Sequence, residues 1–149
     1  MFECELPPYT FRIKNKGDKR YIFDAYRAKY VRATPEERVR QQICRYLCTE
    51  KQYPQTLVFN EAVISVNGMT RRCDTVVYSS NHTPLMLLEY KAPNVPITQA
   101  VFEQAMQYNH VLQVPYIVVS NGKKHFCCKL DTGRNRYVFL TEIPLYTLL

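Results

Sequence analysis

A helical repeat of apolar residues marks the segment from Pro35 to about Lys51. Every fourth position is apolar, which predicts a helix with one buried stripe made of Val39, Ile43 and Leu47. Thr34 suits the N-cap, and Pro35 suits the first helical position. Glu37 lies three residues after Thr34 and would complete a capping box. We therefore expect a helix that begins at Pro35.

Three strand-like runs follow this helix. Leu57–Val66 and Met69–Ser79 are rich in β-branched and apolar residues, and Asn67-Gly68 between them fits the positive φ angles of a tight hairpin turn. A third run, Leu85–Lys91, follows a short polar turn. These runs are expected to form an antiparallel meander.

A second helix and two further strands complete the expected core. Thr98 can cap a helix that runs to about Leu112. Tyr116–Ser120 is the nearly all-apolar kind of strand that is buried on both faces of a sheet, and Lys124–Leu130 is predicted to follow it. Because the second helix would lead to a parallel strand, the predicted fold class is α/β with a mixed sheet, in the order helix, three strands, helix, strand.

The composition fits one folded unit. The chain has 149 residues, of which 46% are apolar and 22% are charged, a normal balance for a single globular domain. We expect basic N-terminal strands or an extension over residues 1–33, a core over 34–130, and a C-terminal strand or tail over 131–149. No linker or internal repeat suggests a second domain.

The N-terminal part is rich in positive charge. Tyr9–Lys14 and Tyr21–Asp24 are predicted to be short strands, followed by an irregular basic stretch as far as Thr34. Residues 12–40 contain ten Lys or Arg against four Asp or Glu, and the whole chain has a formal net charge of +7. Such a segment is either a solvated surface or a contact for phosphate groups.

The sequence also limits the class of protein. No apolar run approaches the roughly 18 residues of a membrane span, and the N-terminus lacks the basic start and apolar stretch of a secretory signal. We therefore expect a cytoplasmic protein that has no membrane partner. The six cysteines are expected to be free thiols in that reducing compartment, and the three histidines do not have zinc-ligand spacing with them.

Three charged residues interrupt the most apolar part of the chain. Asp74 lies within the second strand of the predicted meander, and Glu89 and Lys91 end the third, on one sheet face. Antiparallel pairing can bring them together. Two neighbouring carboxylates repel each other and invite a hard cation such as Mg²⁺, while Lys91 could stabilise the charge on a phosphodiester under attack. The residues indicate metal-assisted phosphodiester hydrolysis, and a salt-bridged cluster at a strand end is the structural alternative.

These residues resemble the signature of the PD-(D/E)xK nuclease superfamily, an acid on one strand and Glu-x-Lys on the next. Here they are Asp74 and Glu89-Tyr90-Lys91, with Cys73 where the signature has a proline. The expected element order also resembles the αβββαβ core of that superfamily. The resemblance implies a restriction-endonuclease-like fold and a deoxyribonuclease that uses Mg²⁺ or Mn²⁺, with Asp74 and Glu89 as metal ligands.

A closer resemblance covers about residues 10–130. It is to the N-terminal nuclease domain of type I restriction enzyme R subunits, and in particular to short bacterial proteins that carry this domain alone. The segments that carry the resemblance are Tyr21-Ile22-Phe23-Asp24, Pro35-Glu36-Glu37-Arg38-Val39-Arg40-Gln41, Arg72-Cys73-Asp74, Glu89-Tyr90-Lys91-Ala92-Pro93, Gln104-Ala105-Met106-Gln107-Tyr108-Asn109 and Asn121-Gly122. It implies a restriction, defence or repair function, in which Gln104 and Tyr108 position DNA or the site carboxylates.

The superfamily often adds a carboxylate from the first helix, and two are available here. Glu36 lies near the centre of the stripe that must face the sheet, whereas Glu37 lies to one side and can serve the capping box. We therefore favour Glu36 over Glu37 as a third site acid and metal ligand. Acids in the first turn of a helix also favour its dipole without any catalytic role.

Several basic residues are candidates for DNA contact. Arg72 is expected on the sheet face of Asp74, where it would contact either a phosphate or an acid. Arg38 and Arg40 are further candidates. The chain has no Gly-x-x-x-x-Gly-Lys-Ser/Thr loop, so we expect no ATP site on it. The expected partners are DNA together with a second copy of the chain, since cutting both strands takes two sites, or with restriction or repair subunits.

Two other functions stay open. One is a non-catalytic DNA-binding module that keeps the nuclease fold and uses residues 12–40 for phosphate contact. The other is a protein-interaction subunit, with an apolar patch around the C-terminal residues 143–149. The intact Asp74, Glu89 and Lys91 favour the nuclease over both.

Overall fold

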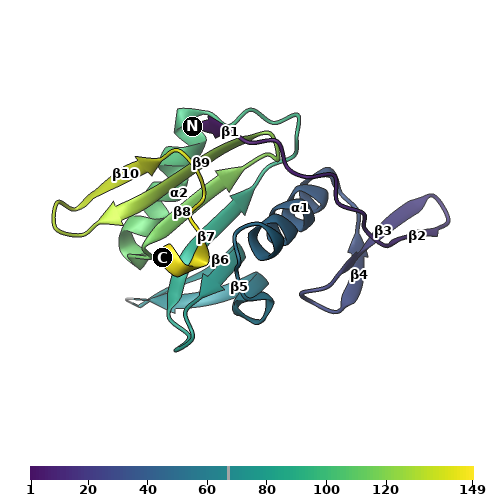
Figure 1. Ribbon diagram of the computed structural model, residues 1–149, viewed down its shortest axis with the longest axis horizontal. Helices are drawn as coiled ribbons and strands as arrows, with labels where there is room; N and C mark the ends of the chain where they lie inside the picture. Colours follow the sequence, from purple (N-terminus) through teal and green to yellow (C-terminus); the bar gives the residue numbers. More distant parts are fainter. Residues whose placement is uncertain (67) are drawn as a thin grey trace.

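A mixed sheet forms the centre of the computed structural model, which describes residues 1–66 and 68–149 (Figure 1). In these residues the sheet has seven strands: β1 (Phe2–Glu3), β5 (Val58–Val66), β6 (Met69–Tyr78), β7 (Pro84–Tyr90), β8 (Tyr116–Ser120), β9 (Lys124–Asp131) and β10 (Arg136–Leu140). Their spatial order is β1-β9-β8-β7-β6-β5, and β10 also pairs with β9. β7 and β8 are parallel, and the other neighbours are antiparallel.

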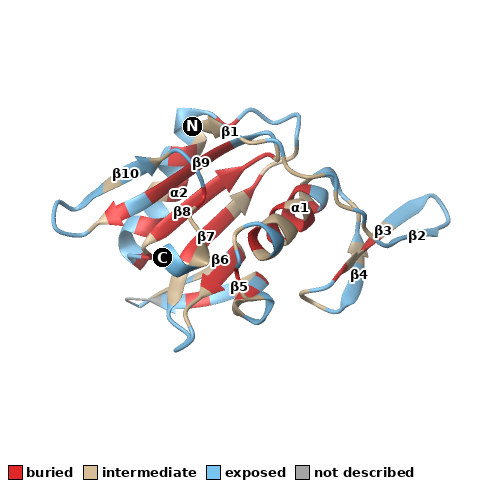
Figure 2. Ribbon diagram, in the orientation of Figure 1, coloured by how far each residue is buried: buried red, intermediate tan, exposed pale blue. Residues whose placement is uncertain are grey.

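Two helices cover opposite faces of this sheet, α1 (Pro35–Thr49) and α2 (Gln99–Leu112) (Figure 1). Successive residues of β7 show the division, because Leu88 packs in the cluster that contains α1 and Leu87 packs against α2. As the apolar repeat predicts, α1 buries Val39, Ile43 and Leu47. Each such side chain contributes about 1.5–3 kcal/mol through burial. Figure 2 shows these buried positions along the inner strands and the inner side of α1.

The element order confirms the predicted fold class. α1, β5, β6, β7, α2 and β8 follow one another as helix, three strands, helix and parallel strand. The bounds differ from the expected ones by one or two residues, and α1 ends at Thr49 rather than near Lys51. The predicted Asn67-Gly68 turn includes Asn67, which lies outside the described residues.

The start of α1 follows only half of the predicted capping arrangement. Thr34 Oγ1 accepts a hydrogen bond from the Glu37 N–H at 3.1 Å, which confirms the N-cap. The Glu37 carboxylate does not serve a capping box: it binds Arg27, Arg40 and Gln41. Charge-assisted bonds to guanidinium groups are stronger than a bond to a backbone amide, which explains why this part of the prediction is wrong.

A second, three-stranded antiparallel sheet lies beside α1 (Figure 1). It consists of β2 (Ile13–Lys16), β3 (Lys19–Asp24) and β4 (Lys29–Arg32). The stretch after Asp24 was expected to be irregular, but it forms β4 because it pairs with β3 over four residues. The first strand begins at Ile13 rather than at Tyr9.

The C-terminal segment packs against the sheet and α1. Ile143 is buried in the α1-side core, and the Tyr146 hydroxyl donates a hydrogen bond to the Tyr78 carbonyl at 3.1 Å. A short 3-10 helix, η2 (Tyr146–Leu148), ends the chain, and another, η1 (Gln55–Leu57), precedes β5. Leu148 is exposed, so the apolar tail is packed except at this residue. Among the described helices, none is long and apolar enough to cross a membrane.

The turn after β8 provides a test of how closely it packs on α1. Gly122 has φ +88°, and a Cβ there would lie 3.3 Å from Val39 Cγ2, whereas Gly17 has φ +64° with no atom within 4 Å of such a Cβ. Both alanine variants are strained by the positive φ, but only Gly122→Ala also crowds the core. We expect Gly122→Ala to lower the free energy of unfolding by about 2–4 kcal/mol and Gly17→Ala by about 1–2 kcal/mol, measured by urea denaturation. Equal losses would show that Val39 moves aside.

Candidate active site

The candidate site lies where β6 and β7 part. The last paired residues at this end are Thr75 and Leu88, so Asp74 and Glu89 come next in register on neighbouring strands. Asp74 Oδ2 accepts a hydrogen bond from the Tyr90 N–H at 2.9 Å. This bond ties the Asp74 carboxylate to the strand that carries Glu89.

The sheet is distorted at the same level. Glu61 of β5 has φ +55° and stands opposite Asp74, between regular pairs on either side. Asn60 and Ala62 are two residues apart, yet Asn60 bonds to the α1 side and Ala62 packs in the cluster on the α2 side. The usual alternation of faces is therefore broken at Glu61 and Asp74, the kind of backbone irregularity that often accompanies functional sites.

Four of the predicted site residues lie around one hollow on the α2 side. Glu89 and Lys91 reach it from the end of β7, and Gln104 and Tyr108 reach it from α2. Its volume is about 160 Å³. The i, i+2 spacing of Glu89 and Lys91 and the i, i+4 spacing of Gln104 and Tyr108 thus direct both pairs to the same place.

Arg71 completes the hollow, and sequence reasoning missed it. Its guanidinium binds Glu89 Oε1 at 2.5 Å and lies 4.5 Å from the centre of the Tyr108 ring. Simple strand alternation places Arg72, not Arg71, on the face of Asp74. The break in alternation at Asp74 reverses this expectation, so no periodic signal in the sequence could have identified Arg71.

The surroundings of Glu89 shift its pKa upward. Burial and then the neighbouring Asp74 raise the pKa of Glu89 to about 7, even though Arg71 and Lys91 act in the opposite direction. When it is protonated, Glu89 can donate a hydrogen bond to Asp74. Glu89 therefore gains and loses its proton near neutral pH.

The two acids of the first helical turn have different surroundings. Burial and Asp74 raise the pKa of Glu36, while Lys91 and Arg40 partly oppose this shift, so Glu36 lies in the field of the site. Glu37 instead binds Arg27 Nη2 at 2.7 Å and Arg40 Nη1 at 3.1 Å. Glu37 is thus taken up by arginines, and Glu36 is the acid of this turn that Asp74 influences electrostatically.

The three predicted DNA-contacting arginines lie in different environments. Arg40 is only 5% exposed and pairs with Glu37 and Glu61, an environment that favours a structural ion pair over a DNA contact. Arg72 binds Glu61 at 2.8 Å, which is the salt-bridge alternative, although its side chain remains 70% exposed. Arg38 is exposed and remains a candidate.

A buried polar network supports the site from the α1 side. The Tyr90 hydroxyl donates to Thr75 Oγ1 at 3.0 Å, and Thr75 donates to Asn60 Oδ1 at 2.6 Å. The Cys44 thiol of α1 donates to the same Asn60 oxygen at 3.4 Å. The three strand residues Tyr90, Thr75 and Asn60 directly adjoin Glu89, Asp74 and Glu61 in sequence, so the network fixes the backbone that carries the three acids.

The donor set suits a hard divalent cation. Mg²⁺ is typically held by one or two carboxylates, with waters and phosphate oxygens as its other ligands, and Asp74 and Glu89 supply that pair. Within the described residues, no group of three or more His, Cys, Asp or Glu is arranged to hold a metal ion. Glu36 therefore does not form a preformed three-carboxylate metal site with Asp74 and Glu89 in the described structure.

Comparison with known proteins identifies a family. The family described as "Type I restriction enzyme R protein N terminus" matches residues 35–144. A solved fragment described as an HsdR subunit of a type I restriction enzyme from Vibrio vulnificus YJ016 is similar at 18% identity and a TM-score of 0.48, over 71% of this chain and 24% of that one. The chain thus spans about a quarter of that fragment. Comparison with curated proteins gives no match.

The raised pKa of Glu89 makes a prediction about pH. The pKa of Glu89 in the folded protein lies above the usual value of 4.5. Glu89 therefore contributes to the free energy of unfolding at low pH, and this contribution is lost as pH rises from about 4.5 through about 7. Without divalent cations, Glu89→Gln should therefore unfold with a free energy about 1–3 kcal/mol higher than wild type at pH 8.5, and with little difference at pH 4.5.

Urea denaturation at the two pH values measures this effect. The exposed Glu103→Gln of α2 removes the same charge away from Asp74 and serves as the control, with little change expected at either pH. A destabilised Glu89→Gln at pH 8.5 would mean that the bond to Arg71 outweighs the repulsion by Asp74.

Proposed function

The chain belongs to the family of the type I restriction enzyme R protein N terminus, and we propose that it is a metal-dependent DNA endonuclease of a restriction system. Asp74, Glu89 and Lys91 form the proposed centre. Glu36, Gln104 and Tyr108 assist it. The proposed partners are DNA and either a second copy of the chain or other subunits of the system.

The placement of Asp74, Glu89 and Lys91 together where β6 and β7 part carries this proposal, and the pKa of Glu89 supports it. In a purely structural salt bridge, the partner cations would hold the pKa of the acids low. Arg71 lies against Glu89, yet the pKa of Glu89 stays raised, because of burial and because Asp74 lies beside it. A site that keeps two such carboxylates together, with a lysine beside them, favours a cation-binding function over a salt-bridged cluster.

The chemistry follows from the groups around the hollow. In phosphodiester hydrolysis, a water oxygen bonds to phosphorus while the bond to the leaving oxygen breaks; the water loses a proton and the leaving oxygen gains one. The Lys91 ammonium can donate hydrogen bonds to a non-bridging phosphate oxygen and stabilise the charge that develops there. Bound by Asp74 and Glu89, a Mg²⁺ or Mn²⁺ ion would supply Lewis-acid stabilisation of the same charge.

The remaining residues have positioning and proton-transfer roles in this proposal. Glu36, with a raised pKa beside Lys91, is suited to accept the proton that the water loses. Gln104 and Tyr108 offer hydrogen bonds to the DNA backbone from α2. Once it leaves Glu89, the Arg71 guanidinium can bind a phosphate in two-point fashion.

A DNA-binding module without cleavage is the second candidate. It is favoured by the bond between Arg71 and Glu89, because a catalytic cation would have to displace that guanidinium. If the protein is such a module, substitution of Asp74 or Lys91 has no effect on any DNA-processing activity.

Nicking of supercoiled plasmid tests the proposal. Wild-type protein should cut in Mg²⁺ or Mn²⁺ and not in EDTA, whereas Asp74→Ala and Lys91→Ala should lose at least about 100-fold in rate because they remove a cation ligand and the charge-stabilising ammonium. Lys123→Ala, an exposed lysine outside the site, should cut like wild type.

The outcome separates the two candidates. No cutting of plasmid, linear, single-stranded or branched DNA, together with no Mg²⁺ binding by calorimetry, would contradict the nuclease proposal and leave the binding module. Mg²⁺ binding that is lost in Asp74→Ala, but without cutting, would show a cation site that needs a partner subunit for activity.

A further inference from the structure

The three-stranded sheet has a strongly cationic face that the nuclease site does not use. Directly paired residues of antiparallel strands lie on the same face, and the pairs Lys14–Tyr21, Tyr21–Arg32 and Lys16–Lys19 therefore share one. The Phe23 N–H donates to the Arg12 carbonyl at 2.9 Å, so Arg12 lies beside Phe23 on this same face. The resulting cationic face holds Arg12, Lys14, Lys16, Lys19 and Arg32, all of them exposed.

Aromatic rings alternate with these cations. Arg12 lies 4.1 Å from the centre of the Phe23 ring, Lys14 lies 5.6 Å from that of Tyr30, and Arg32 lies 5.8 Å from that of Tyr21. Such contacts hold the long side chains over the sheet instead of leaving them free in solvent. Tyr30 is 42% exposed, so its ring is open to a ligand.

The opposite face of this sheet packs on the body of the protein only in part, because Ile13, Asn15, Arg20 and Lys29 on it are exposed. Ile22 and Asp24 are fully buried there, and Asp24 binds Arg27. No acid is paired with any cation of the cationic face in the part of the chain that the structure describes. The face therefore presents five uncompensated positive charges, against +7 for the whole chain.

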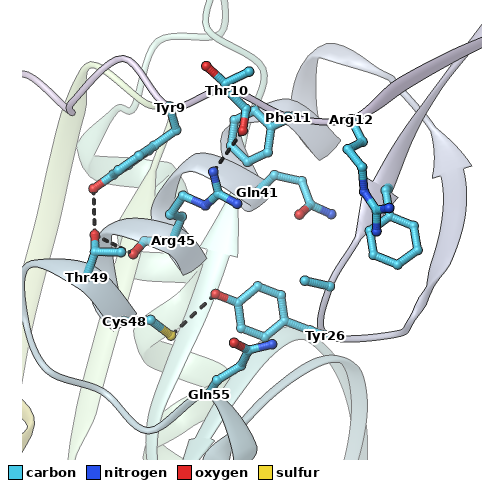
Figure 3. Close-up of a pocket in the computed structure, with 12 residues that line it drawn as sticks. Tyr9, Thr10, Phe11, Arg12, Tyr26, Gln41, Arg45, Cys48, Thr49 and Gln55 are labelled. Carbon is cyan, nitrogen blue, oxygen red and sulfur yellow. Dashed lines mark hydrogen bonds between the residues drawn. The ribbon is translucent and has the colours of Figure 1, made fainter.

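A pocket of about 500 Å³ continues this face toward α1 (Figure 3). Arg12 and Phe23 belong to both, and Tyr9, Phe11 and Tyr26 add further rings to the pocket. Arg45 of α1 lies 5.0 Å from the Phe11 ring and donates to the Thr10 carbonyl at 2.8 Å. In the described structure no Asp or Glu lines the pocket, so its lining also combines aromatic rings with positive charge.

We propose that the cationic face and this pocket bind single-stranded DNA, with phosphates on the lysines and arginines and bases against the rings. A positive surface interleaved with aromatic side chains is the usual arrangement for binding single strands. The choice of DNA as the polyanion rests on the proposed function. Binding is a separate property of the protein, because Asp74, Glu89 and Lys91 take no part in it.

The pocket favours a single strand over a duplex. A base in a duplex is stacked and paired, and it reaches a pocket only after it is flipped out, at an additional energetic cost. A base in a single strand can enter directly. The pocket is also large enough for a nucleobase, and the Gln41 amide, held by its bond to Glu37 at 3.0 Å, can offer hydrogen bonds within it.

A chain of ion pairs connects this surface to the nuclease site. Arg27 joins Asp24 of β3 to Glu37 of α1, and Arg40 joins Glu37 to Glu61 of β5. Glu36, the neighbour of Glu37, lies in the field of Asp74. The cationic face is therefore held in a defined position relative to the site, so that a bound strand can extend toward it.

Fluorescence anisotropy with a labelled 20-nucleotide oligo(dT) in EDTA tests the proposal. The charge-reversal variant Lys14→Glu/Lys16→Glu/Lys19→Glu should bind at least about tenfold more weakly than wild type. Loss of three phosphate contacts should also reduce the slope of log K against log salt by about 2. Tyr30→Leu keeps the charge and should weaken binding by about fivefold or more through lost stacking.

A matched control has the same charge change at the other end of the molecule. Lys129→Glu/Arg134→Glu/Arg136→Glu reverses three exposed cations of the β9–β10 hairpin, which lies at the opposite end of Figure 1 from the three-stranded sheet, and should retain wild-type affinity within about threefold. Thermal melts of all variants establish that they are folded.

Several results would overturn the proposal: no binding of oligo(dT) by wild type at low salt, equal losses in both triple variants, or tighter binding of a duplex or of oligo(U) than of oligo(dT). Failure of the nuclease is distinguishable from these. If Lys91→Ala, or the wild type itself, does not cut but binds oligo(dT) as described, the binding surface stands and only the cleavage proposal falls.

Discussion

The buried guanidinium of Arg40 determines how the acids around it are arranged. A charge that is 5% exposed must be paired, and Arg40 takes Glu37 from its own helix and Glu61 from β5. Two consequences follow. Glu37 is withdrawn from the helix cap, and Glu36 is left as the acid of the first turn that lies in the field of Asp74. Glu61 lies with a positive φ at the point where the alternation of β5 breaks, opposite Asp74.

The same arrangement divides the acids into two sets with opposite electrostatics. Burial alone would raise the pKa of Glu61, but Arg40 and Arg72 hold it below its usual value. The pKa of Glu36 and that of Glu89 are raised, because burial and Asp74 outweigh the cations near them. Neighbouring carboxylates whose pKa values move apart are typical of sites that divide structural and chemical roles. Here Glu61 and Glu37 are paired with arginines, while Glu36 and Glu89 are the acids to which we assign the proposed chemistry.

The helical repeat of apolar residues and the two-residue alternation of strands predicted the elements whose side chains follow these repeats. The stripe of Val39, Ile43 and Leu47 gives the position of α1, and the i, i+2 spacing of Glu89 and Lys91 gives their shared hollow. Arg71 could not be found in this way, because the break at Asp74 reverses the faces of β6. The burial of Arg40 and the pairing of β4 depend on tertiary partners that no local pattern encodes.

Helix α1 is the element that the two proposed surfaces share. Its first turn brings Glu36 to the site, and a later turn brings Gln41 and Arg45 to the pocket beside the three-stranded sheet. The nuclease site is rich in acids, so on its own it repels the phosphates that it must approach. Five uncompensated cations on the neighbouring sheet act over roughly a Debye length of 8 Å in physiological salt and can hold a polyanion against that repulsion. Under the two proposals, affinity for DNA and the chemistry on DNA come from different elements, and the ion pairs from Asp24 to Glu61 connect these elements.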